Sequence, residues 1–337
     1  MSLSNRFVLP ALICSVLVLF SAALSFAQTT AAASNTGTSS SATNGAAVSQ
    51  GGAGHVVPAQ AVLTGPNLSV SYAAQHDSTT GWANVLTPDF SYRFGRHASV
   101  DVNVPWYLTL QAYETTTVRG TTTTTLTQAN NVLGDTTAAL HFQASGGNLS
   151  YIATLAGGLP TGDKSLGVST GSATYNFTQH VDYSIGPFTP DVEFGVGDST
   201  ILASHFLRKS YAAVGALANF QVGTSVDLPG KLSLDAEAYE AMPLAAQTVF
   251  GTIMGRGGSG KARSKQVLQG AGVAEDNGFT VELDVPLTAR LNLAGTYGHS
   301  LIQQADIAGV SLTWTLRSAR HVDAGAPSSP MTNTGGR

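Results

Sequence analysis

The chain has 337 residues, of which 11% are charged and 43% are hydrophobic, and its formal net charge is −4. This charged fraction is well below the ~25% typical of soluble domains, yet no interior stretch approaches the ~20 apolar residues of a membrane helix. Composition therefore argues against a soluble cytosolic enzyme and against a helical membrane protein. The weakly acidic balance also argues against nucleic acid as a partner, because nucleic-acid binders gather Lys and Arg on one face.

The amino terminus has the pattern of an export signal. Arg6 precedes an apolar run that ends near Leu24, and Ser25-Phe26-Ala27 supplies small residues at the cleavage position. We therefore expect a cleaved signal peptide at residues 1–27. The segment 28–66 is rich in Ala, Ser, Thr, Gly and Asn and has no Lys, Arg, Asp or Glu, which predicts a disordered low-complexity linker.

Beyond the linker, apolar and polar residues alternate with a period of two, which is typical of strands with one apolar and one polar face. The segment 98–112 shows this best. Its apolar face holds Val100, Val102, Val104, Trp106, Leu108 and Leu110, and its polar face holds Ser99, Asp101, Asn103, Tyr107, Thr109 and Gln111. A strand of this length exceeds the ~5 to 6 residues usual in globular sheets. The alternation recurs to Leu316, and we predict twelve strands.

The predicted connections alternate between short and long. Tight turns are expected near residues 96, 147, 187, 229 and 287, and mostly long loops at 76–86, 113–130, 159–175, 199–209 and 246–272, with a short one at 302–306. Short turns at one end, long loops at the other and an even strand number are features of bacterial outer-membrane barrels.

The predicted fold is therefore all-β, an antiparallel up-and-down transmembrane β-barrel at residues 67–317 followed by a polar tail at 318–337. Val102, Leu140, Val281 and Leu312 are predicted to face lipid. A soluble secreted sandwich is the less favoured alternative, because it does not explain whole strand faces of Val, Leu, Phe and Trp beside so few charges.

Acidic residues fall on the polar strand faces near the tight turns, with Arg93 as their main basic neighbour. We predict that the following residues line the periplasmic end of the barrel lumen: Arg93, Asp101, Asp182, Asp191, Glu193, Asp235, Glu237, Glu282 and Asp284. Because rings of Asp and Glu favour cations, one interpretation is a cation-preferring constriction. Carboxylates that are simply solvated or paired inside the lumen are an equally supported interpretation.

The basic residues gather in a different place. The segment 250–269 contains Arg256, Lys261, Arg263 and Lys265, and no acid occurs between Glu240 and Glu275. We expect this loop outside the cell, where the phosphates of lipopolysaccharide would bind clustered cations. A merely solvated, Gly-rich loop is the alternative.

Catalysis is the less favoured alternative to a channel. His180 and Asp182 share one strand face and His141 lies on a neighbouring hairpin, and a base of this kind with a Ser or Thr nucleophile is the minimum for acyl transfer. Side chains two residues apart are poorly aimed for a catalytic dyad, and no metal-ligand spacing occurs. We therefore expect no enzyme, no catalytic residues, no cofactor and no metal.

The order of several motifs resembles a known family. The sequence DFSYRF is followed by VDVNVPWYL, by the pair Gly134-Asp135 and by GGLPTGDKSLG, of which Leu159–Asp163 is the most specific part. This order resembles the phenol-degradation meta-pathway family of bacterial outer-membrane proteins. The resemblance implies an outer-membrane barrel that passes small aromatic or hydrophobic molecules. The expected function is a passive channel, and the alternative is a plugged structural or surface-interaction barrel.

Overall fold

The computed structural model describes residues 63–78, 80–118, 121–203, 211–254, 262–264, 267–269, 275–317 and 320–321. Its strands are β1 Leu63–Asp77, β2 Gly81–Arg93, β3 Ala98–Asn103, β4 Trp106–Val118, β5 Thr121–Leu133, β6 Thr136–Gly146, β7 Leu149–Leu159, β8 Thr174–Tyr183, β9 Phe188–Ser199, β10 Tyr211–Leu228, β11 Leu232–Pro243, β12 Gln247–Met254, β13 Ala262–Ser264, β14 Val267–Gln269, β15 Asp276–Thr288, β16 Leu291–Ser300, β17 Ala305–Arg317 and β18 Arg320–His321. Two short helices, η2 Lys164–Leu166 and α2 Thr200–Ala203, lie in connections. Neither has the length and hydropathy needed to span a lipid bilayer.

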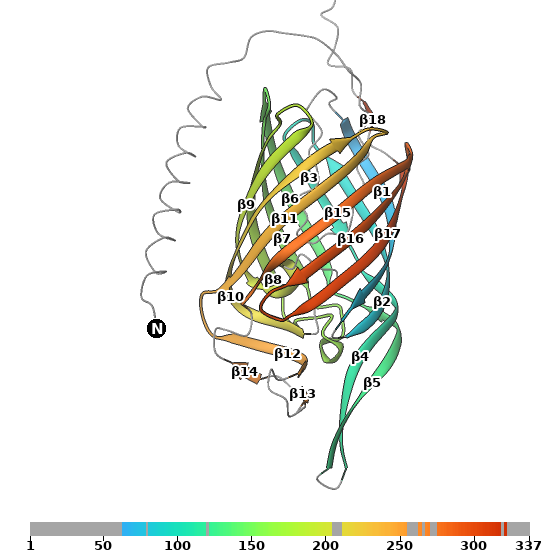
Figure 1. Ribbon diagram of the computed structural model, residues 1–337, viewed down its shortest axis with the longest axis vertical. Coiled ribbons are helices and arrows are strands. Elements are labelled where there is room, and N and C mark those ends of the chain that lie inside the picture. Colours follow the sequence, from blue (N-terminus) through green and yellow to red (C-terminus); the bar gives the residue numbers. More distant parts are fainter. Residues whose placement is uncertain are drawn as a thin grey trace, which may run out of the picture. The chain divides into compact units, whose positions relative to one another are not determined.

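The strands form one antiparallel sheet that closes on itself, because β1 pairs with both β2 and β17 (Figure 1). Three pairs of strand segments, β3 with β4, β5 with β6, and β11 with β12, each continue one strand of the wall. The short segments β13 and β14 pair with β12, and β18 pairs with β1, so they extend existing strands and add none to the wall. Counted this way, the wall is the predicted twelve-stranded barrel. In a closed sheet the backbone N–H and C=O groups of the first and last strands pair with each other. Lipid offers these groups no hydrogen bonds, so a sheet that crosses a membrane must pair them all.

The predicted tight turns are confirmed. Gly147 and Asn148 join β6 to β7, and comparably short segments join β8 to β9, β10 to β11 and β15 to β16. The long connection at 159–175 is also confirmed, between β7 and β8.

Two predicted loops are wrong. Residues 76–77 and 81–86 belong to the ends of β1 and β2, and the Thr80 N–H donates to Asp77 Oδ1 at 2.9 Å in the short connection between them. Residues 113–118 and 121–130 belong to β4 and β5, which pair with each other, threonine opposite threonine, as in Thr115 with Thr124. This hairpin extends past the last pairing of β4 with β2, at Leu110 (Figure 1). Threonine is β-branched and favours strands, but the uniformly polar runs Thr115–Thr117 and Thr121–Thr125 show no alternation.

Other boundaries also differ from the prediction. β1 begins at Leu63, inside the predicted linker 28–66, and β18 pairs Arg320 with Thr64 inside the predicted tail 318–337. Part of the predicted loop 246–272 forms β12, β13 and β14. The predicted signal peptide 1–27 lies outside the described residues.

The two faces of the wall have opposite character. On the outer face, Val102 is 39%, Leu140 52% and Leu312 38% exposed, while inward neighbours such as Thr137 and Thr313 are buried. Large aromatic side chains are exposed near both ends of the strands. Phe94, Tyr183, Phe188 and Trp314 lie toward the end with the predicted tight turns, and Trp82, Tyr175 and Tyr297 lie toward the opposite end. Such paired aromatic girdles mark the two interfaces of a barrel that spans a bilayer.

The predicted apolar face of 98–112 needs one correction. Asn84 pairs with Thr109 and Val85 pairs with Tyr107, so Leu108 is an extra residue, a β-bulge. A one-residue shift reverses the facing of every later side chain. Leu110 is therefore fully buried on the inner face, although the alternation places it with Val100 on the outer one.

Candidate functional site

The inner face of the wall carries all of the predicted lumen residues. Each occupies a strand position that alternates with exposed apolar residues, as Glu193 does between Val192 and Phe194. Asp182 is 5% and Glu193 7% exposed. Most of the acids lie in the halves of their strands near the tight turns, and Glu282 lies at the middle of β15.

Most of these acids lie on neighbouring strands, and we call them the acid wall: Asp182 on β8, Asp191 and Glu193 on β9, Asp235 and Glu237 on β11, and Glu282 and Asp284 on β15. Several are directly opposite one another across strand pairs. Asp182 pairs with Asp191, and Asp235 pairs with Glu282. Like charges in such positions repel, so bound protons or cations must compensate for them.

Neutral donors and one histidine compensate part of this charge. Thr280 Oγ1 donates to Glu237 Oε2 at 3.3 Å, and Thr296 Oγ1 donates to Glu282 Oε2 at 3.0 Å. His180 lies within the acid wall, with Nε2 3.6 Å from Asp182 Oδ2 and Nδ1 3.9 Å from Glu193 Oε2. These contacts leave several carboxylate oxygens facing the lumen.

A second sector, on β2, β3 and β6, mixes charges of both signs. Arg93 donates to Gln143 Oε1, and His141 Nε2 contacts Asp101 Oδ1. Asp89, 7% exposed, lies in the same sector with Oδ1 3.5 Å from Ser69 Oγ. Sequence reasoning missed Asp89 as a lumen residue, although the alternation around Phe90 does place it on the polar face.

The connection between β7 and β8 is tied to the inner side of the wall, and we call residues 160–173 the latch loop. Asp135 is 3% exposed, and its carboxylate accepts the N–H of Gly162 at 3.0 Å and that of Thr170 at 3.1 Å. Thr161 Oγ1 adds a hydrogen bond to the Gly134 carbonyl at 2.9 Å. A Cβ on Gly162 would lie 2.8 Å from the Gly134 carbonyl carbon, so only glycine allows this approach.

The latch loop brings apolar side chains to the inner face at the end with the long connections. Val168 packs in a buried cluster with Ala83, Val85, Tyr107 and Leu110. Leu166 packs against the same cluster. The lumen therefore has an apolar cluster toward one end and the acid wall toward the other.

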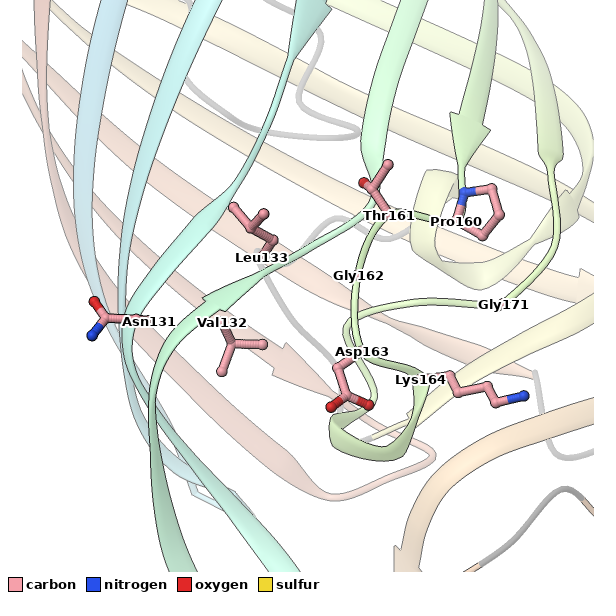
Figure 2. Close-up of a pocket in the computed structure, with 9 residues that line it drawn as sticks. All are labelled: Asn131, Val132, Leu133, Pro160, Thr161, Gly162, Asp163, Lys164 and Gly171. Atoms are coloured by element: carbon pink, nitrogen blue, oxygen red, sulfur yellow. The ribbon is translucent and has the colours of Figure 1, made fainter.

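A cavity of about 650 Å³ lies between the end of β5 and the latch loop (Figure 2). Its lining residues are Asn131, Val132, Leu133, Pro160, Thr161, Gly162, Asp163, Lys164 and Gly171. None of the predicted lumen residues lines it, so this cavity is separate from the acid wall.

The two histidines considered as candidate bases, His180 and His141, differ in their contacts. His180 Nδ1 is buried without a hydrogen-bond partner, and Nε2 is 3.6 Å from Asp182 Oδ2 rather than at hydrogen-bond distance. His141 contacts Asp101, and its Nδ1 is 2.9 Å from Thr154 Oγ1. Within the described residues, no group of three or more His, Cys, Asp or Glu is placed to hold a metal ion.

The predicted basic loop is mostly outside the described residues. Arg256, Lys261 and Lys265 lie in its undescribed parts, and Arg263 lies in β13.

Comparison with solved structures finds similarity to an outer membrane channel, a porin and a transporter. An outer membrane channel from Pseudomonas putida F1 is 13% identical over 77% of this chain and 99% of that one, with a TM-score of 0.48. The KdgM porin is 8% identical over 74% and 99%, with a TM-score of 0.43, and the Ralstonia pickettii toluene transporter TbuX is 10% identical over 77% and 90%, with a TM-score of 0.39. No family model matches the chain, and no curated protein matches it.

Proposed function

We propose that the protein is a bacterial outer-membrane channel through which small solutes pass passively. The observation that carries this proposal is the contrast between the faces of the closed wall. The outer face is apolar and bounded by aromatic girdles, and the inner face is polar apart from the apolar cluster near the latch loop. A sheet of this kind suits lipid outside and water inside.

The acid wall supports a preference for cations. Carboxylates on a lumen lower the barrier for cations and raise it for anions. Arg93 and His141 lie in another sector, on β2 and β6, so they leave the acid wall largely uncompensated. This supports the predicted roles of Asp101, Asp182, Asp191, Glu193, Asp235, Glu237, Glu282 and Asp284 as lumen residues.

The solute class that we favour combines a polar or cationic group with a small apolar or aromatic body. The resemblance to the phenol-degradation family implies aromatic or hydrophobic solutes. The cluster of Val168, Leu110 and Val85 supports it, because it gives such a body an apolar contact inside the barrel.

Conductance of the purified protein in a planar lipid bilayer tests the proposal. A channel gives discrete current steps in KCl, whereas a plugged structural or surface-interaction barrel, the alternative, gives none. The buried apolar cluster under the latch loop is the observation that favours this alternative. Absence of current from correctly folded protein would therefore overturn the channel function.

We also propose that the basic loop faces lipopolysaccharide. Arg256, Lys261, Arg263 and Lys265 would bind its phosphates, Arg through bidentate contacts and Lys as point charges. Replacing all four by Gln should weaken binding of purified lipopolysaccharide, and the difference should shrink at high salt because exposed charges are screened over ~8 to 10 Å at physiological ionic strength. Unchanged binding, or protection of the loop from protease added to intact cells, would contradict this role.

A further inference from the structure

One glycine on the inner face of β10 is closely covered by two acids. Gly223 pairs with Asp191 on one side and with Glu237 on the other. A Cβ on Gly223 would lie 2.9 Å from Asp191 Oδ1 and 2.8 Å from Glu237 Cγ. Both acidic side chains therefore lean over the space that any other residue would fill. This creates a carboxylate cradle over Gly223.

Part of the cradle lacks hydrogen-bond donors, although its Glu237 accepts a hydrogen bond from Thr280 Oγ1. Asp182 extends it, since it pairs with Asp191 across β8 and β9. Oδ2 of Asp182 and Oδ2 of Asp191 are both buried and accept no hydrogen bond. By contrast, Glu282 accepts from Thr296, and Asp284 accepts from Asn292 Nδ2 at 2.7 Å. Buried carboxylate oxygens without donors are costly, and two facing acids raise the cost.

A neutral side chain next to the cradle is also unpartnered. Gln221 precedes Gly223 on the same face of β10, and its exposed fraction is 0%. Neither its Oε1 nor its Nε2 has a hydrogen-bond partner. It pairs with Glu193, so it adjoins the acids without being one of them. A fully buried carboxamide with both polar atoms unpaired needs a water molecule, an ion or a ligand to supply the missing contacts, and a lumen ligand can do so.

We propose that Asp182, Asp191, Glu237 and Gln221 form a binding site for the ammonium group of small primary amines. An ammonium carries three N–H donors and one positive charge, which match carboxylate oxygens and the Gln221 carbonyl oxygen. His180 is the nearest competing positive group when protonated, at 3.6 Å from Asp182. The inference rests on the proposed channel function and deepens it, because it names a solute class for the lumen.

Calorimetric titration of the purified protein in detergent tests this site, with butylammonium as the probe and tetramethylammonium as its control. Tetramethylammonium has the same charge but no N–H donors, so it should bind at least about tenfold more weakly. Asp191→Asn and Glu237→Gln should each weaken butylammonium binding by about tenfold. Glu282→Gln removes a charge from the same lumen outside the cradle and should change the affinity by less than about twofold.

Gly223→Ala separates the shape of the cradle from its charge. The added methyl group must push Asp191 and Glu237 apart, so butylammonium binding should fall at least about tenfold although every carboxylate remains. Folding of each variant is checked by the shift in gel mobility on boiling. Equal affinity for the two probes, equal losses in Glu237→Gln and Glu282→Gln, or no binding by the folded wild type would overturn the site.

The outcome for the site and the outcome for the channel are distinguishable. If butylammonium binds but no bilayer current is seen, the proposed channel function is wrong and the proposed binding site stands. Current without butylammonium binding would leave the channel and show that the acids of the cradle hold protons or diffuse counter-ions instead.

Discussion

The buried Asp135 links the pair Gly134-Asp135 to the segment that begins at Leu159, 25 residues later in the sequence. Its buried carboxylate accepts the Gly162 and Thr170 N–H groups, and the Thr136 N–H donates to Thr161 Oγ1 at 2.8 Å with the two residues 25 apart in sequence. The sequence alone shows both motifs, but it does not show that one anchors the other. That relation depends on the tertiary position of the latch loop.

The hydrogen bonds from the latch loop to Asp135 should contribute to the stability of the protein. Asp135→Asn keeps the shape of the side chain but replaces one acceptor oxygen by a donor, so one loop N–H loses its partner. We expect the free energy of unfolding to fall by about 1–3 kcal/mol. Urea titration in lipid vesicles measures it. Lys164→Gln, on the exposed part of the same loop, is the control and should change stability by less than about 0.5 kcal/mol. Similar losses in both variants would show that Asp135 does not anchor the loop.

At the scale of the strand, the two faces of the wall predict opposite responses to charge. Leu140 is 52% exposed on the outer face, and His141 follows it on the inner face. Leu140→Arg should cost ~2–4 kcal/mol in lipid if it lies near the bilayer midplane. His141→Arg should cost much less, because Arg can still reach Asp101. Equal tolerance of Arg at the two positions would mean that the faces are assigned wrongly.

Because of the bulge at Leu108, Leu110 lies on the inner face, whereas simple alternation would place it on the outer face. Leu110 is fully buried in the cluster under the latch loop, so Leu110→Ala should cost about 2–5 kcal/mol. Leu126, 47% exposed on the partner strand of the same hairpin, is the control and should cost much less when changed to Ala. Thermal denaturation monitored by circular dichroism compares them. If Leu110→Ala leaves the stability unchanged, this side chain lies on the outer face instead.

These elements show where sequence reasoning succeeds and where it stops. Alternation is a local signal, so it predicts the faces of regular strands, such as β3 with Val102 outward and Asp101 inward. The shift at Leu108 depends on the pairing partner, Asn84 and Val85 on β2, which the local pattern does not contain. The cradle over Gly223 cannot be predicted from the local pattern either, because it depends on β9 and β11 pairing with the two edges of β10.

At the scale of the whole molecule, the closed sheet predicts an unusual resistance to detergent. The wall joins β1 to β17 without a free edge between them, so the barrel should stay folded in dodecyl sulfate until it is boiled. The boiled and unboiled forms should migrate differently on a gel, and the protein should fractionate with outer membranes. Identical migration, together with recovery in the soluble periplasmic fraction, would contradict a membrane barrel.

The most direct test of the account is the reversal potential of single channels across a KCl gradient. The acid wall predicts a potential of the sign that K⁺ selectivity produces, and the potential should move toward zero when the pH is lowered enough to protonate the carboxylates. Replacing Asp182, Asp191, Glu193 and Glu237 by their amides should have the same effect at neutral pH. A potential of the sign that Cl⁻ selectivity produces, or one that these replacements leave unchanged, would contradict the role assigned to the acid wall.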